Sequence, residues 1–421
     1  MTYAATAAWL RPRLWMGAVV GVVPWAVWLG SLAFGGWYKD AEGTLIGADH
    51  LAFYTAAHLI RDGQPERMYN YKDLNKTGYQ RNLIGWEWNG FEAFRNPPFY
   101  ALLYLPTAEL SFYASCLIWM ALGLPLLALS SWLLHPQRPV RVFLWSLAFY
   151  PIFATTSFGQ NTLISLAIFA GVYRLLETDR RFAAGFVAGL LWFKPQLLLG
   201  LFIWWAFAPR RYFRCWLGVG TMGAILAALC WGVLPEASRA FVKNLPTIVG
   251  YRGFGLWNVH TPKVFFWLLL RRWSEANASE DSQSFELVIA VNQLLTLPIT
   301  GISVAIAWRI AKRSHASVAA MFPVAVYLSL WASPHTLIYE WALLIAVGVV
   351  LWKRYPNHRD AWLCLFVLAW AALTISTTFA YVQIHFLDLP SVVQISIPIL
   401  GVVGWLGARE LAAARSSEEQ S

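Results

Sequence analysis

Charged residues are scarce in this chain. Only 13% of its 421 residues are Asp, Glu, Lys or Arg, whereas 58% are hydrophobic. A soluble domain has roughly 25% charged residues, and no stretch long enough for such a domain remains between the apolar runs. The composition excludes an ordinary soluble protein and predicts an all-α polytopic membrane protein, because lipid leaves no other partner for the backbone of a spanning segment.

Cysteine pairs and metal-ligand patterns are also lacking. The four cysteines are scattered in or beside apolar runs without a CxxC pair, at Cys116, Cys215, Cys230 and Cys364. Since no His, Cys or Asp cluster has the spacing of a metal site, we expect no disulfide, no metal and no other cofactor. The chain shows no internal repeat of the kind found in inverted-repeat transporters, and we expect one domain over residues 1–421.

The excess of positive charge has a simple explanation. The net charge of +10 comes from Lys and Arg in short loops, a pattern that sets orientation in a membrane, so no nucleic-acid partner is expected. Arg11 and Arg13 precede the first apolar run, which predicts a cytoplasmic N-terminus. The polar tail, about 410–421, falls on the same side, and two long loops, about 35–97 and 235–284, fall on the periplasmic side of a bacterial inner membrane.

The apolar runs predict about ten full transmembrane helices, with short or re-entrant helices between them. The clearest runs cover about 14–34, 112–134 and 215–233, each long enough to cross a bilayer. We expect residues 142–158 to form a further span. Residues 98–110 are apolar but too short to cross, so they predict a surface or re-entrant helix.

One apolar run, over residues 182–207, is interrupted in its middle by Lys194 and Pro195. Basic residues flank both of its ends, at Arg181 and Arg210, so both ends should lie in the cytoplasm. Proline removes a backbone donor and breaks a helix. Two half-helices forming a hairpin fit this pattern better than one crossing, and a single kinked span is the alternative.

Asp49 follows the first span by about fifteen residues and begins a helix-like run, expected to be an amphipathic helix at the outer membrane face. A carboxylate there indicates a general base acting on a lipid-linked substrate. The competing interpretation is that Asp49 only caps the helix. Lys194 presents a similar choice, because an intramembrane lysine is a functional candidate by default whereas snorkelling to the cytoplasmic interface is the structural alternative.

Further polar residues are expected on the outer face, and each has a structural explanation as well. They are Arg95, Gln160, Asn161, His260, His335 and Glu340. His335 can cap a helix, and Glu340 can bond a neighbouring backbone group. Gln160 and Asn161 can form a polar contact between helices, and His260 alone carries little weight.

Aromatic side chains of the first long loop fit two roles. Trp86 and Trp88 are typical of anchors at the membrane interface, and equally of platforms on which sugars stack. Tyr54, one helical turn beyond Asp49, is a third candidate for sugar stacking. The sequence alone does not decide between the two roles.

In their order and spacing these motifs resemble glycosyltransferase family 87, a GT-C type that uses polyprenol-phosphate mannose. The resemblance rests on Asp49 with Tyr54, Gly63 with Tyr69, Asn96-Pro97-Pro98, Gly159-Gln160-Asn161, Phe193-Lys194-Pro195, Ser333-Pro334-His335 and Tyr339-Glu340. It implies a GT-C-like fold, a polyprenyl-phosphate-sugar donor, inversion at the anomeric carbon, and Asp49 as the base. Many relatives have Tyr in place of Asn96, and Glu340 departs from an expected Asp or small residue, which leaves the sugar open.

The resulting hypothesis is an enzyme that moves mannose, or a related hexose or pentose, from a polyprenyl-phosphate carrier to a lipid or glycan acceptor at the outer face. Asp49 would take the acceptor's proton, and a single prominent loop carboxylate suffices because the leaving phosphate carries its own charge. The residues expected to bind the donor phosphate are Lys194, Arg95 and His335. Those expected to contact the substrates are Tyr54, Trp86, Trp88, Gln160, Asn161, His260 and Glu340.

Two other functions remain open at this stage. A flippase or transporter for a lipid-linked sugar needs access from both faces, and the one-sided long loops favour the enzyme. An oligosaccharide ligase with a diphosphate donor would need more cations near the site.

Overall fold

The computed structural model describes residues 2–34, 45–88, 90–248, 258–273, 283–385, 387 and 393–414. Within these residues the regular structure is helical, apart from one isolated bridge between Val259 and Leu337. Six helical segments are long and apolar enough to cross a membrane, and they lie in Tyr3–Phe34, Phe112–Leu134, Pro209–Val233, Ile289–Arg313, Pro356–Ala380 and Ser396–Ala413. The protein is therefore an all-helical membrane protein, and the count of ten spans stays a prediction.

The α-helices follow in chain order. Those of the first part are α1 (Tyr3–Leu10), α2 (Leu14–Phe34), α3 (Ala48–Arg61), α4 (Lys76–Ile84), α5 (Phe112–Leu134), α6 (Pro139–Leu147), α7 (Tyr150–Ser157), α8 (Thr162–Glu177) and α9 (Arg181–Ala188). Those of the second part are α10 (Leu199–Phe207), α11 (Pro209–Val233), α12 (Pro235–Ile248), α13 (Pro262–Trp273), α14 (Gln283–Arg313), α15 (Val318–Trp331), α16 (Leu344–Arg354), α17 (Arg359–His385) and α18 (Ser396–Ala413). Short 3-10 helices connect them, namely η1 (Arg11–Arg13), η2 (Pro65–Tyr69), η3 (Pro98–Thr107), η4 (Gly189–Phe193), η5 (Pro195–Leu198), η7 (Ile338–Leu343) and η8 (Pro356–His358).

The three clearest predicted spans are confirmed as α2, α5 and α11, and the short segment after residue 98 is η3. The single helix expected over residues 142–158 is wrong, because α6 and α7 are separate. Indole N–H groups satisfy the backbone between them: Trp25 donates to the Leu147 carbonyl at 2.9 Å and Trp370 to the Ala148 carbonyl at 2.9 Å. These donors come from α2 and α17, so neighbouring helices stabilise the break.

The interrupted apolar run forms the predicted hairpin. Arg181, at the start of α9, donates from Nη1 to the Arg211 carbonyl at 2.8 Å, and α10 ends directly before α11 begins. Both ends of the run therefore lie at one level, with Lys194 between η4 and η5. Glycine permits the close packing of α9 on α11, since a Cβ on Gly185 would lie 2.0 Å from the Cys215 carbonyl oxygen.

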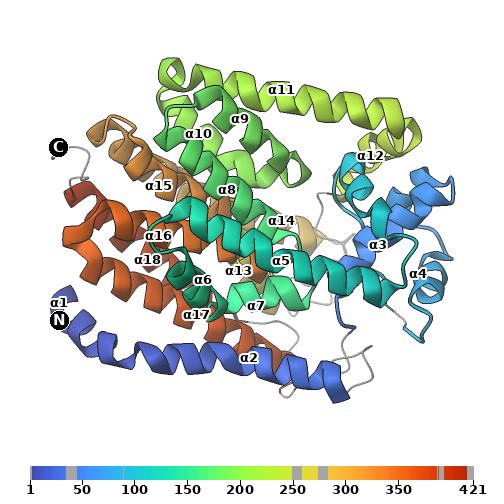
Figure 1. Ribbon diagram of the computed structural model, residues 1–421, viewed down its shortest axis with the longest axis horizontal. Coiled ribbons are helices and arrows are strands. Elements are labelled where there is room, and N and C mark those ends of the chain that lie inside the picture. The colour runs from blue at the N-terminus through green and yellow to red at the C-terminus, as the bar shows by residue number, and fades with distance from the viewer. Residues whose placement is uncertain are drawn as a thin grey trace.

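The two ends of the bundle differ (Figure 1). The chain termini lie at one end, whereas α3, α4 and α12 gather at the other. The basic loops meet at the end that holds the termini: Arg11 Nη2 lies 2.5 Å from Asp360 Oδ1, and Arg211 donates to the His315 carbonyl at 2.7 Å. The loops that the charge pattern places on one side thus share one end of the molecule.

Helix α3 occupies an unexpected position. The amphipathic pattern predicts a helix at the membrane surface, yet all ten residues from His50 to Leu59 are buried. The aromatic residues of η3 cover one face, with the Phe53 and Tyr104 rings stacked 4.9 Å apart. Because α3 lies inside the protein, the acidic residue at its start is held rigidly.

Candidate active site

Asp49 lies in the first turn of α3, where its backbone is bound by the end of α7. The N-cap of α3 is Gly47, with φ of 69° and no side-chain cap, so the interpretation of Asp49 as the cap is wrong. The N–H groups of Gly47 and Asp49 donate to the carbonyls of Ser157 (3.2 Å) and Phe158 (3.1 Å). Backbone carbonyls thus do the work of a capping side chain, which frees the carboxylate for other contacts.

The turn after α7 brings Gln160 to Asp49. Gly159 has φ of 69°, and a Cβ there would lie 2.8 Å from the His50 Cβ, so only glycine allows this close approach. The Gln160 backbone N–H donates to the Thr155 carbonyl at 2.8 Å. The Gln160 side chain hydrogen-bonds the Asp49 carboxylate, as expected if both belong to one site.

Lys194 forms a buried ion pair with Glu340. Lys194 Nζ lies 2.9 Å from Glu340 Oε1, and the two side chains are 10% and 1% exposed. The ammonium also lies 5.3 Å from the centre of the Tyr339 ring, a cation–π geometry. Glu340 Oε2 accepts the Leu337 backbone N–H at 3.0 Å, so its bond to a neighbouring backbone is confirmed, whereas snorkelling of Lys194 is wrong.

The surroundings of Asp49 make it a stronger base than an ordinary aspartate. Burial raises the pKa of Asp49 to about 6, while the Gln160 hydrogen bond and the Lys194 charge oppose the rise and the Glu340 charge adds to it. A carboxyl with this pKa is ionised at neutral pH and close to the ideal for proton transfer. The carboxylate also lies at the positive end of the α3 dipole.

A second acid of the first long loop, Glu92, is not among the site residues predicted from the sequence. Burial raises the pKa of Glu92 to about 8, with a contribution from the Asp49 charge and an opposing one from Arg95. Arg95 is held in turn by the Ile248 carbonyl, which accepts from its Nη1 at 3.1 Å. Whether one loop carboxylate acts in the site stays a prediction. Glu92 lies far from Asp49 in the chain, and no spacing in the sequence joins the two.

Asn161 and His335 lie beside the elements that carry this cluster. Asn161 is 1% exposed, and its side chain lies against the Tyr100 hydroxyl. The His335 backbone N–H donates to Ser333 Oγ at 3.2 Å, in the segment that leads to Glu340. Contact of either residue with a substrate or a phosphate stays a prediction.

His260 and Tyr54 have structural contacts of their own. His260 Nδ1 lies 2.7 Å from Ser396 Oγ, at the start of α18, and its backbone N–H donates to the Thr336 carbonyl at 2.7 Å. The Tyr54 hydroxyl donates to the Leu110 carbonyl at 2.6 Å, and Tyr54 is 3% exposed. These bonds explain both residues without a substrate, and their predicted binding roles stay untested.

Trp86 and Trp88 are partly buried beside α3. Both pack against one apolar cluster, composed of Leu45, Leu51, Tyr54, Ile84 and Phe112. This packing joins the segment after α4 to the helix that carries the acid. A stacking role with sugars stays a prediction.

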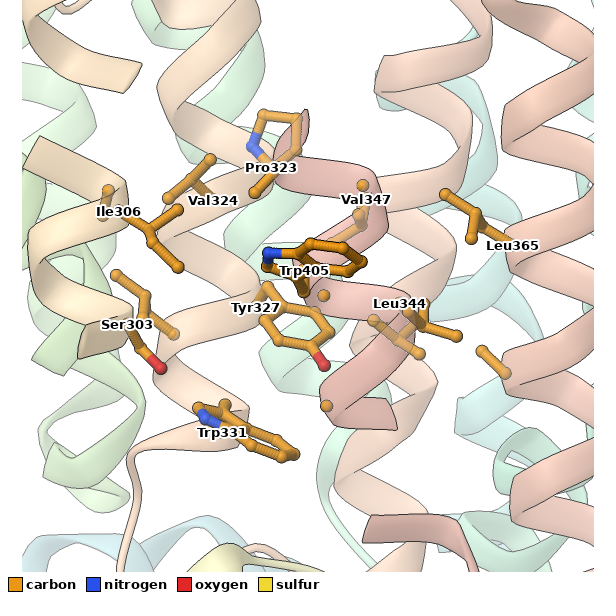
Figure 2. Close-up of a pocket in the computed structure, with 18 of the residues that line it drawn as sticks. Ser303, Ile306, Pro323, Val324, Tyr327, Trp331, Leu344, Val347, Leu365 and Trp405 are labelled. Atoms are coloured by element: carbon orange, nitrogen blue, oxygen red, sulfur yellow. The ribbon is translucent and has the colours of Figure 1, made fainter. Parts of the chain in front are cut away.

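An apolar cavity of about 490 Å³ lies among α14, α15, α16, α17 and α18 (Figure 2). Trp405 lies between Tyr327 and Val347 in this view, and most of the lining side chains are hydrophobic. Trp331 ends α15 and Leu344 begins α16, so the cavity borders both helices that flank the segment with His335 and Glu340.

One comparison with known proteins gives a match. The model of glycosyltransferase family 87 matches residues 94–334, more than half of the chain. Arg95, Gln160 and Lys194 lie inside the matched range, and Asp49 lies before it. No curated protein and no solved structure matches the chain.

Proposed function

Because the chain belongs to glycosyltransferase family 87, we propose that it is an inverting enzyme that moves a sugar from a polyprenyl-phosphate carrier to a lipid or glycan acceptor. The sugar is mannose or a related hexose or pentose. The observation that carries this proposal is that the Lys194 charge acts on Asp49. A base and a fixed cation from distant parts of the chain thus belong to one site. A transferase with a phosphate leaving group needs both.

The roles in the proposed reaction follow from the positions of the charges. Asp49 accepts the proton of the acceptor hydroxyl as that oxygen attacks the anomeric carbon. The bond between sugar and phosphate breaks, and the phosphate leaves with the electron pair. Lys194 and Arg95 stabilise the growing charge, with His335 as a third contact, and no metal takes part. Attack opposite the leaving group inverts the anomeric carbon.

The apolar cavity supports a lipid-linked donor. Its volume of about 490 Å³ falls within the range of about 300–1,000 Å³ of small-molecule sites. Three of the helices around it, α14, α17 and α18, contain candidate spans, so a chain dissolved in the bilayer can reach it. We assign it to the isoprenoid tail, because Trp331 and Leu344 place its wall next to the Glu340 segment.

We place the site on the periplasmic face of a bacterial inner membrane. The basic loops and the described ends of the chain gather at the opposite end of the molecule, and clustered Lys and Arg mark the cytoplasmic side. The lipid donor and the glycolipid or glycan acceptor then meet outside the cytoplasm.

The test compares two donors in proteoliposomes that contain the purified protein. A radiolabelled mannosyl polyprenyl monophosphate and its diphosphate analogue, with the same chain length, are each supplied with an extract of envelope glycolipids. We expect a new glycosidic bond from the monophosphate alone. Labelled lipid that crosses the bilayer without a new bond would identify a flippase, and preference for the diphosphate would identify a ligase; either result overturns the proposal.

A further inference from the structure

The carboxylate of Glu340 is held in place through both of its oxygens. Oε2 accepts the Leu337 N–H at 3.0 Å, and the Glu340 N–H in turn donates to the Leu337 carbonyl at 3.0 Å. Oε1 lies 2.9 Å from Lys194 Nζ. One oxygen therefore fixes the acid on its own segment, and the other holds the lysine.

The segment that carries Glu340 is anchored to two other parts of the chain. The Thr336 carbonyl accepts the His260 N–H at 2.7 Å, and the Thr336 hydroxyl donates to the Leu330 carbonyl of α15 at 2.8 Å. Trp341 donates from its indole Nε1 to the His260 carbonyl at 3.2 Å. Because the chain is bound on both sides of Glu340, the carboxylate has a defined position.

The backbone of Lys194 is also bound, at the tip of the hairpin. Its N–H donates to the Leu191 carbonyl at 2.7 Å, and its carbonyl accepts the Leu197 N–H at 2.9 Å. The Phe193 carbonyl accepts from Asn96 Nδ2 at 2.9 Å. These bonds fix the point from which the lysine side chain starts, and they leave the position of its ammonium to other contacts.

The ammonium of Lys194 needs partners of its own, because it lies at the end of a flexible four-carbon stem. Two groups of η7 supply them: the Glu340 carboxylate at 2.9 Å, and the Tyr339 ring, whose centre lies 5.3 Å away. A contact between full charges is stronger than one with a ring face. An ammonium has three N–H groups, so it can keep its bond to Glu340 and still donate to a phosphate oxygen.

We propose that Glu340 is a positioning residue of the candidate site, which fixes the ammonium of Lys194 where the charge of the leaving phosphate grows. The inference rests on the proposed function and extends it by a role for Glu340. A cation that is fixed before the reaction stabilises the transition state without the cost of moving into place. Glu340 thus acts on the donor through Lys194.

The first experiment measures donor kinetics in Glu340→Gln, Glu340→Asp and the control Glu177→Gln, which removes a carboxylate that pairs with a lysine at the other end of the protein. An amide holds the ammonium without a charge, so Glu340→Gln should lose about tenfold in kcat/KM for the donor. Glu340→Asp keeps the charge on a shorter side chain and should lose less, and Glu177→Gln should match wild type. Wild-type kinetics in either variant of Glu340 overturn the inference.

A double-mutant cycle separates positioning from direct contact with the donor. Lys194→Gln removes the charge and keeps an N–H for Glu340. In that background Glu340→Gln should have no further effect on kcat/KM, because its action depends on the lysine. Thermal unfolding in detergent checks that each variant is folded. A second loss of similar size in the double variant would assign Glu340 a role independent of Lys194 and overturn the inference.

A binding experiment needs no sugar transfer, so it separates this inference from the proposed function. The melting temperature of the purified protein is measured with undecaprenyl phosphate and with undecaprenol, which lacks the phosphate. We expect the phosphate to stabilise wild type and Glu177→Gln more than the alcohol does, and this difference to shrink in Glu340→Gln and Glu340→Asp. An equal effect of the two lipids on wild type, or an unchanged difference in the Glu340 variants, overturns the inference even where wild type transfers sugar. The expected shifts without any transfer would support it and overturn the proposed function.

Discussion

Two carboxylates at opposite ends of the protein, Glu177 and Asp49, are bound in contrasting ways. At the end with the basic loops, Glu177 Oε1 accepts the Tyr173 hydroxyl at 2.6 Å, lies 3.1 Å from Lys353 Nζ and pairs with Arg354. Arg174 Nη1 lies 3.2 Å from the other oxygen. Cations and a hydroxyl surround this carboxylate, which ties α8 to α16.

Fewer groups stabilise the negative charge of Asp49. One neutral amide, from Gln160, bonds it, and the lysine in its field is already 2.9 Å from Glu340. A surrounded carboxylate such as Glu177 stabilises the fold and is inert toward protons. A carboxylate with few partners for its negative charge, such as Asp49, has a raised pKa, which is the property of a catalytic base.

The largest expected effect comes from Asp49→Asn. Loss of the base should lower kcat by about 10²–10⁴-fold, measured with a labelled monophosphate donor. The pKa of Asp49 is about 6 in the folded protein, against an ordinary value of 3.8, so the folded state favours the protonated carboxyl. This stabilisation is fully present below the ordinary pKa and is lost as the pH rises through about 6. The variant should therefore be as stable as wild type or more so at pH 7, by at most roughly 3 kcal/mol. Wild-type transfer by Asp49→Asn would refute its role as base.

The next effect separates two lysines that pair with carboxylates, Lys194 with Glu340 and Lys353 with Glu177. Lys194→Met combined with Glu340→Gln removes the cation without leaving a buried charge alone, and should raise the KM for the donor by roughly 10- to 100-fold. Lys353→Met leaves Glu177 with Arg354 and should keep a wild-type KM. Donor kinetics of both proteins provide the check. Equal KM values in the two variants would assign Lys194 a structural role.

The acid side of the pH profile tests Asp49 in the unaltered protein. A base acts only when ionised, so kcat/KM should fall about tenfold for each unit below pH 6. The raised pKa depends partly on Glu340, whose negative charge favours the protonated acid. In Glu340→Gln the pH below which kcat/KM falls should therefore be lower than in wild type. If kcat/KM of wild type falls only below about pH 4, the pKa of Asp49 is not raised and the residue lacks the proposed surroundings.

The smallest effect on activity is expected at the other carboxylate. Glu177→Gln leaves Lys353 and Arg354 without their anion, and both are partly exposed, so the loss of stability should be roughly 1–3 kcal/mol. Thermal unfolding in detergent measures it. Below the unfolding temperature the KM for the donor should equal that of wild type, and a large change in KM would show that the two ends of the protein are coupled.

The class of the protein and several local features follow from the sequence by itself. Long apolar runs predict α2, α5 and α11, because bilayer thickness sets the length of a span. The break at Lys194 is equally local, since Pro195 removes a donor wherever it lies. An isolated acid after the first span was enough to single out Asp49.

Which polar groups meet was decided by the tertiary structure alone. The separation of α6 from α7 depends on indoles of other helices, and the burial of α3 depends on the aromatic residues of η3. Glu340 pairs with Lys194, and the charge of Asp49 acts on Glu92, only because segments far apart in the chain pack together. The periodicity of a sequence shows which face of its own helix a residue occupies. The groups that neutralise the charge of that residue lie on other helices, and periodicity does not place those helices.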